Sequence, residues 1–106
     1  MATDWIAALK EQAQLAQRFA REIPKALANP ELTLDQASQI YDFLEKAILD
    51  FHRIVEDMKK DNPDDALSEA ARRLEDIWAS ISVVVMNKLR AMQKPEPGNL
   101  GDGDKN

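Results

Sequence analysis

The single histidine, His52, is the side chain of this sequence best suited to proton or phosphoryl chemistry. An exposed histidine on a helical bundle can accept a phosphoryl group, provided that a cation and a small residue lie close by. One turn after His52 the chain has Glu56, which can pair with the ring, and Asp50 and Asp57 lie in the same region. Because a negative neighbourhood opposes phosphorylation, a histidine phosphotransfer domain acting through His52 ranks last among our functional hypotheses. We expect an ordinary solvent-exposed side chain.

Adjacent carboxylates are the second feature that could carry chemistry, as general acids or metal ligands. They occur at Glu56-Asp57, Asp64-Asp65 and Glu75-Asp76. Adjacent residues of a helix point apart, so solvated charged faces are the expected role. A di-metal carboxylate site in a bundle needs Glu-x-x-His motifs on two helices, and one histidine cannot supply them. The sequence also lacks cysteine, which excludes thiolate chemistry and disulfides. We predict no catalytic residue, no metal, no cofactor and no enzymatic activity.

The elements that would position these side chains are helices. Prolines and glycines divide the chain into three segments rich in Ala, Leu, Glu, Lys, Gln and Arg, which favour helix. We predict helices over about 4–28, 34–60 and 63–93. The final stretch, 95–106, has turn formers and no apolar periodicity, which is typical of a disordered tail. The sequence therefore predicts one domain, 1–94, followed by this tail.

The start signals of the helices differ in strength. Thr3 is the predicted N-cap of the first helix, with Asp4 in its first turn. The second helix has the strongest signal, a capping box formed by Thr33 and Gln36. For the third, Asn62 is the predicted N-cap and the proline after it occupies the first helical position.

Pro24 interrupts the first helical segment. A proline inside a helix removes one backbone hydrogen bond and crowds the preceding turn. The first helix is therefore expected either to kink or to end at this residue.

Apolar residues recur with alternating spacings of four and three along the second and third segments. Such heptads, on three helices joined by short connections, are typical of an all-α, three-helix antiparallel up-down-up bundle with coiled-coil-like packing. A lane is a row of residues at heptad spacing along one face of a helix. Trp5 and Trp78 lie in lanes that are apolar, so core packing is their expected role. The residues predicted to be buried at mid-bundle are Leu44, Ile48, Phe51, Leu74, Trp78 and Ile81. Val84 and Val85 are predicted to extend the core.

Four apolar residues lie on lanes that are otherwise polar. Val83 shares its lane with charged residues, and Met86 lies one turn further along, with Ala79 beside them. Residues three or four apart on a helix touch, so these side chains would form one apolar patch on the face opposite the core. Leu49 occupies a corresponding position on the second helix. Single exposed apolar residues are common on any protein, but this grouping favours a contact surface.

Composition limits the partners of such a surface. The 106 residues carry a formal net charge of −5, and an acidic surface repels phosphate backbones and anionic lipid. No apolar run approaches the roughly 18 to 20 residues of a membrane span. We therefore expect no nucleic acid and no membrane as partner, and a cytoplasmic location.

Two functional hypotheses remain besides phosphotransfer. The first is a small protein that acts by binding another protein, as an adaptor, a chaperone or a regulatory inhibitor. The second is a self-associating structural protein whose patch closes a homodimer. In either case the predicted protein-binding residues are Ala79, Val83, Met86 and Leu49.

Overall fold

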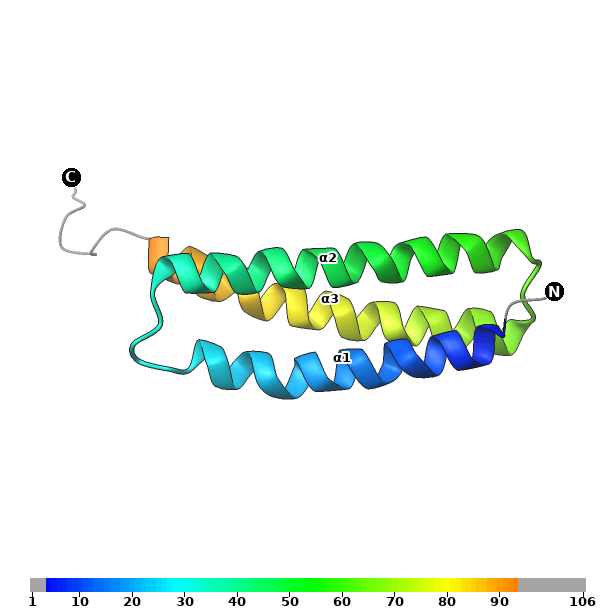
Figure 1. Ribbon diagram of the computed structural model, residues 1–106, viewed down its shortest axis with the longest axis horizontal. Helices are drawn as coiled ribbons and strands as arrows, with labels where there is room; N and C mark the ends of the chain where they lie inside the picture. Colours follow the sequence, from blue (N-terminus) through cyan, green and yellow to red (C-terminus); the bar gives the residue numbers. More distant parts are fainter. Residues whose placement is uncertain (1–3, 94–106) are drawn as a thin grey trace, which may run out of the picture.

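The computed structural model describes residues 4–93 and shows a bundle of three helices, as the sequence predicts (Figure 1). The helices are α1 (Trp5–Leu27), α2 (Leu34–Lys60) and α3 (Asp65–Gln93). In Figure 1, α2 runs in the opposite direction to α1 and α3, and α3 lies behind the other two. At 1.5 Å per residue, α3 is about 43 Å long, so the bundle is a rod. The predicted tail, 95–106, lies outside the described residues.

Helix α1 begins one residue later than predicted. The side chain of Asp4 accepts a hydrogen bond from the backbone N–H of Ala7 at 3.1 Å, which makes Asp4 the N-cap. The prediction that Asp4 belongs to the first turn is therefore wrong, and Thr3, its predicted cap, lies outside the described residues. At the other end, α1 continues through Pro24 to Leu27, so the proline does not end the helix.

Helix α2 begins with the predicted capping box. The Thr33 hydroxyl accepts from the Gln36 N–H at 3.1 Å, and the Gln36 side chain accepts from the Thr33 N–H at 3.0 Å. Both donors would otherwise have no partner at the helix end. Both bounds of α2 agree with the sequence prediction, and the start does so because this signal is local and complete.

The connection to α3 differs from the prediction. Asn62 has a φ of 54° and therefore lies in the left-handed region, which asparagine tolerates better than most residues. Asp64 is the residue that caps α3: its carboxylate accepts from the Leu67 N–H at 2.9 Å. The prediction that Asn62 is the N-cap, with Pro63 as the first helical residue, is wrong. Of the two aspartates after Pro63, Asp64 is the N-cap, and Asp65 is the first residue of α3.

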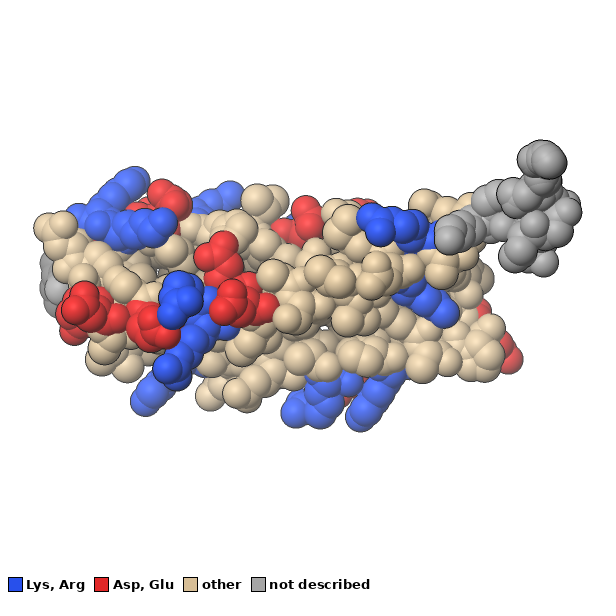
Figure 2. Space-filling model, turned by 180° about the vertical axis from the view of Figure 1, so that it is seen from behind, with Lys and Arg blue, Asp and Glu red and all other residues tan. Residues whose placement is uncertain are grey.

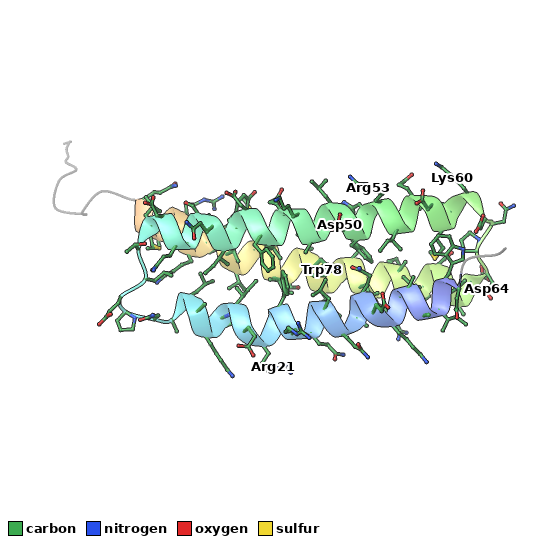
Figure 3. The ribbon with its side chains drawn as sticks, viewed as in Figure 1. Arg21, Asp50, Arg53, Lys60, Asp64 and Trp78 are labelled. Atoms are coloured by element: carbon green, nitrogen blue, oxygen red, sulfur yellow. The ribbon has the colours of Figure 1, made fainter. Side chains whose placement is uncertain are left out.

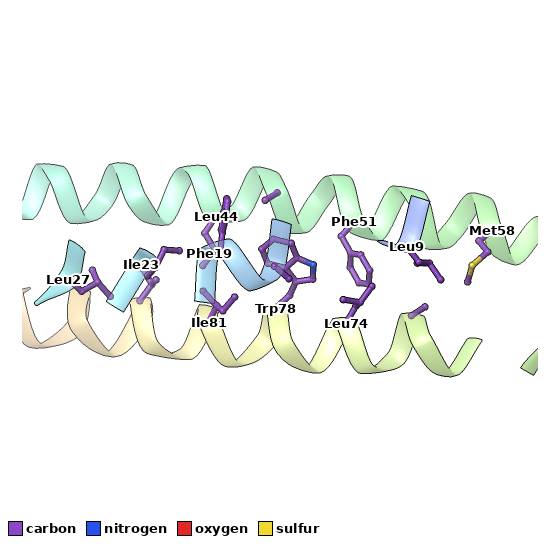
Figure 4. Close-up of a cluster of buried hydrophobic side chains, with 14 residues drawn as sticks. Leu9, Phe19, Ile23, Leu27, Leu44, Phe51, Met58, Leu74, Trp78 and Ile81 are labelled. Carbon is purple, nitrogen blue, oxygen red and sulfur yellow. The ribbon is translucent and has the colours of Figure 1, made fainter. Parts of the chain in front are cut away.

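The core lies along the axis of the rod (Figure 4). Five of the six predicted mid-bundle residues are buried, namely Leu44, Phe51, Leu74, Trp78 and Ile81. Ile48 is only partly buried and packs against this core. Val85 is fully buried, as predicted, but Val84 is 44% exposed, so its assignment to the core is wrong.

Aromatic side chains connect the three helices at mid-bundle. The Trp78 ring of α3 meets the Phe19 ring of α1 edge-on, with centroids 5.3 Å apart, and it also lies near Phe51 of α2. Phe43 of α2 stacks on Phe19 with ring centroids 5.4 Å apart. In Figure 3, Trp78 points between the helices, whereas Arg53 and Lys60 point away from them. The prediction that Trp78 anchors the core is confirmed.

Trp5 has a different role from Trp78. Its ring is partly buried and packs against the edge of the core, and its Nε1 donates a hydrogen bond to Asp61 Oδ2 at 2.8 Å. Asp61 is the C-cap of α2. The indole therefore ties the start of α1 to the end of α2.

Candidate protein-binding surface

The side of α3 that faces away from the core carries the predicted patch. Val83 is 55% exposed and Met86 is 40% exposed, and Ala79 is exposed one turn before Val83. These three residues, at spacings of four and three, lie on one side of the helix. We call them the α3 outer face. The structure leaves each of them accessible, as a contact surface requires.

The α3 outer face lies within an uncharged part of the helix. Residues 77–87 contain no Asp, Glu, Lys or Arg, whereas the next longest uncharged runs in the chain have six residues. Eleven residues span three helical turns, so the absence of charge extends around the whole helix over about 16 Å. Figure 2, which views the bundle from behind, shows a broad area without charged side chains over this part of the molecule.

The turns of α3 that precede this stretch are, in contrast, highly charged. Both carboxylate oxygens of Glu69 accept from Arg72 Nη2 at 2.9 Å, and Oε2 also accepts from Arg73 Nε at 3.3 Å. The hydrogen bonds and positive charge of Arg72, followed by those of Arg73, lower the pKa of Glu69 below its usual value of 4.5. In Figure 2 charged side chains gather over the half of the molecule near the α2–α3 connection. The outer side of α3 thus begins with a charged part, continues with the uncharged stretch 77–87, and ends with a positive charge at Arg90.

Shallow grooves run along both sides of the α3 outer face. Towards α1, Val84 lines a groove of about 180 Å³ together with Ala20 and Pro24. Towards α2, Met86 lines a groove of about 200 Å³ together with Tyr41. Exposed side chains of a partner helix would enter such grooves, as ridges do in helix packing.

Leu49 is on the neighbouring helix and is 58% exposed. One turn after it, His52 Nε2 lies 3.6 Å from Glu75 Oε2 of α3. Ala79 is one turn after Glu75. Because α2 and α3 run in opposite directions (Figure 1), this pairing puts Leu49 and Ala79 at similar heights along the bundle. Leu49 and Ala79 therefore lie at similar heights on two neighbouring helices.

His52 is exposed, as the sequence predicts, but its neighbour is different. The ring pairs with Glu75 across the helix interface and not with Glu56 one turn along its own helix. Sequence spacing alone identifies neighbours within a helix, and Glu75 becomes a neighbour only through the packing of α3. A carboxylate 3.6 Å from the ring nitrogen adds negative charge where a phosphoryl group would attach.

Within residues 4–93 no group of three or more His, Cys, Asp or Glu side chains is placed to hold a metal ion. No helix in the same range has the length and apolar composition needed to cross a membrane.

Three exposed apolar residues, Ile6, Leu34 and Val84, were not predicted from the sequence. Val84 was assigned to the core, and Ile6, which is 60% exposed, belonged to no predicted lane. Ile6 lines a groove of about 610 Å³ between α1 and α3, together with Leu9 and Ala13. Ile6 and Ala13 are seven residues apart, and this heptad spacing was the sequence signal that could have identified the groove. Phe43 is exposed on its outer side and covered by Phe19 on the other.

Of these surfaces, the α3 outer face is the one where exposed apolar side chains coincide with a complete absence of charge over three turns. The groove beside Ile6 is by contrast bordered by Lys10, Glu69 and Arg73. No protein-family model, curated protein or solved structure matches this chain.

Proposed function

We propose that this bundle acts by binding another protein through the α3 outer face, as an adaptor, a chaperone or a regulatory inhibitor, without catalysis of its own. The observation that carries the proposal is the uncharged segment 77–87, with Val83 and Met86 exposed on it. Leu49, exposed at a similar height on α2, is the fourth residue of the proposed surface.

The physical argument concerns what the folded monomer gains from these residues. Apolar side chains contribute to stability when they leave water, at roughly 25 cal/mol per Å². Val83 is 55% and Met86 40% exposed in the monomer, so a large part of their apolar surface adds nothing to its folding. Valine is also a weaker helix former than alanine or leucine. A partner that covers both side chains would recover this free energy.

The surroundings of His52 support a binding role over phosphotransfer. Glu75 lies beside the ring nitrogen, and the residue one turn later is Glu56. Neither position supplies the cation that would hold a phosphoryl group.

The test compares two double variants in capture experiments from the cells that make the protein. Val83→Lys with Met86→Glu places opposite charges on the α3 outer face. Ile6→Lys with Leu34→Glu is the matched control, because these residues are 60% and 40% exposed, against 55% and 40% for the first pair. Surface substitutions of this kind change stability by no more than about 0.5 kcal/mol each, so both variants should keep the melting temperature.

We expect the wild type and the control to capture the same partner and the Val83/Met86 variant to lose it. A partner that covered this face would have to remove two charged side chains from water, which is costly even when they pair with each other, and this is why the variant should fail. Equal capture by all three proteins would refute the assignment of the surface. A Val83/Met86 variant that unfolds would show that α3 is buried on every side, and the proposal would fall with it.

A further inference from the structure

We propose that the partner of the α3 outer face is a second copy of this chain, whose α3 packs antiparallel to the first across a two-fold axis at Val83. This inference shares with the proposed function the exposed α3 outer face, and it assigns to that face self-association in place of, or in addition to, binding of a different protein. It follows from the order of charges along α3, from the small residues near Val83 and from the ion pairs that the monomer forms.

The lane that contains Val83 has a charged residue seven positions away on each side, and the two charges have opposite signs. Asp76 precedes Val83 by two turns and Arg90 follows it by two turns. A two-fold axis at Val83 brings Asp76 of each copy opposite Arg90 of the other, so two oppositely charged pairs form at the ends of the contact. A parallel arrangement would bring Asp76 opposite Asp76, and like charges in contact are destabilising. The charge order therefore selects the antiparallel arrangement.

The residues between these charges suit close contact between two helices. Ala79 and Ser80 are small, and both are exposed. In the same register Ser80 of one copy lies near Asn87 of the other, since their numbers sum to about twice 83. A hydroxyl and an amide can exchange hydrogen bonds there. Small residues at a helix contact allow axes to approach to the low end of the usual 8–10 Å.

Asp76 and Arg90 are available for such pairs. Within residues 4–93 neither side chain takes part in an ion pair. Glu69, the next acidic residue of the lane, is instead held by Arg72 and Arg73 of its own helix. The pKa of Arg72 is raised first by Glu69 and then by the charge of Asp76, but Asp76 and Arg72 form no ion pair. Asp76 and Arg90 are the charges that the antiparallel register brings together.

The size of the surface sets the strength of the association. Three turns of helix are about 16 Å long, and a stable interface needs about 800 Å² per partner. The two grooves beside the α3 outer face, lined by Val84 and by Met86, add area but remain shallow. We expect a weak dimer, with a dissociation constant in the micromolar range or above, so the measurements must extend to millimolar protein.

The first arm of the test exchanges the charges. Asp76→Arg and Arg90→Asp, each alone, turn both attractive pairs into repulsive ones and should weaken self-association about tenfold in analytical ultracentrifugation. The double variant Asp76→Arg with Arg90→Asp restores opposite charges and should return association close to that of the wild type. Lys10→Glu, on α1, is the control substitution and should leave association unchanged.

The second arm uses the absence of cysteine from the chain, so that any introduced thiol is the only one. Position 83 lies at the proposed two-fold axis, so the Val83→Cys variant should form a disulfide-linked dimer in a glutathione buffer. Asp76→Cys alone should not, because two turns on each side of the axis separate the thiols by about 21 Å, beyond the reach of a disulfide. A mixture of Asp76→Cys and Arg90→Cys chains should form the mixed dimer.

The outcomes separate this inference from the proposed function. Concentration-dependent dimerisation, weakened by each single exchange and restored by the double, supports the antiparallel dimer. A wild type that stays monomeric at millimolar concentration overturns it, and so does cross-linking of Asp76→Cys with itself. In both cases the proposed function stands if Val83→Lys with Met86→Glu still abolishes capture of a different protein, and it fails if capture is unaffected.

Discussion

Nε1 of Trp5 donates a hydrogen bond to Asp61 Oδ2 at 2.8 Å, which joins the first residue of α1 to the C-cap of α2. The two residues are 56 positions apart in the chain. The bond therefore connects α1 and α2 at the end of the bundle where α3 begins.

Trp5→Phe should destabilise the bundle by about 1 kcal/mol through the lost hydrogen bond, with a further contribution from the smaller ring. A double-mutant cycle with Asp61→Ala separates these effects and any effect of the aspartate on the helix end. We expect a coupling energy of about 1 kcal/mol from urea unfolding. A coupling energy near zero would mean that the bond contributes nothing in solution.

Leu74 and Leu49 provide a matched test of the core. Leu74 is buried, whereas Leu49 is 58% exposed. Leu74→Ala should cost about 2–5 kcal/mol of unfolding free energy because it leaves a cavity. Leu49→Ala should change stability by no more than about 0.5 kcal/mol. Similar losses from both variants in chemical denaturation would show that the helices are rotated from the positions described.

The Glu69 carboxylate predicts how stability depends on pH. Arg72 and Arg73 lower the pKa of Glu69 in the folded protein, so its contribution is present above the unfolded pKa and is lost as the pH falls through the folded pKa. Glu69→Gln should therefore lower stability near neutral pH and make little difference in acid. Arg72→Gln should move the pKa of Glu69 upward towards 4.5 in an NMR titration of the carboxyl carbon. An unchanged titration would show that the pairing does not persist in solution.

Asp64 and Asn62 test where α3 begins. Asp64→Ala removes the acceptor for the Leu67 N–H and should cost about 0.5–2 kcal/mol. Asn62→Gly should be neutral or stabilising, since glycine adopts the φ of 54° without steric cost. If Asn62→Gly lowered the melting temperature and Asp64→Ala did not, the helix would begin at Pro63.

Local signals explain what the sequence could predict. The capping box of Thr33 and Gln36 involves residues three apart, so it identified the start of α2 without knowledge of the rest of the fold. The 4-3 spacing of Leu74, Trp78 and Ile81 likewise identified the buried side of α3. Both signals depend on helical geometry alone.

Residues whose surroundings depend on packing could not be predicted in this way. Val84 lies at the edge of the buried side of α3, where the position of α1 decides whether it is covered, and α1 leaves it 44% exposed. The pairing of His52 with Glu75 depends on the relative height of α2 and α3. Of the candidate site, the exposure of Val83, Met86 and Leu49 follows from the sequence, whereas the grooves beside them required the structure.

The most direct test of the α3 outer face is photo-cross-linking in the cells that make the protein, with benzoylphenylalanine in place of Val83. The same residue in place of Leu34, which is also exposed, is the control. We predict a discrete adduct from position 83, either at twice the 12.0 kDa of the chain or at the mass of the chain plus another protein, and none from position 34. If position 83 gave no more adduct than position 34, the claim that this face binds protein would be contradicted.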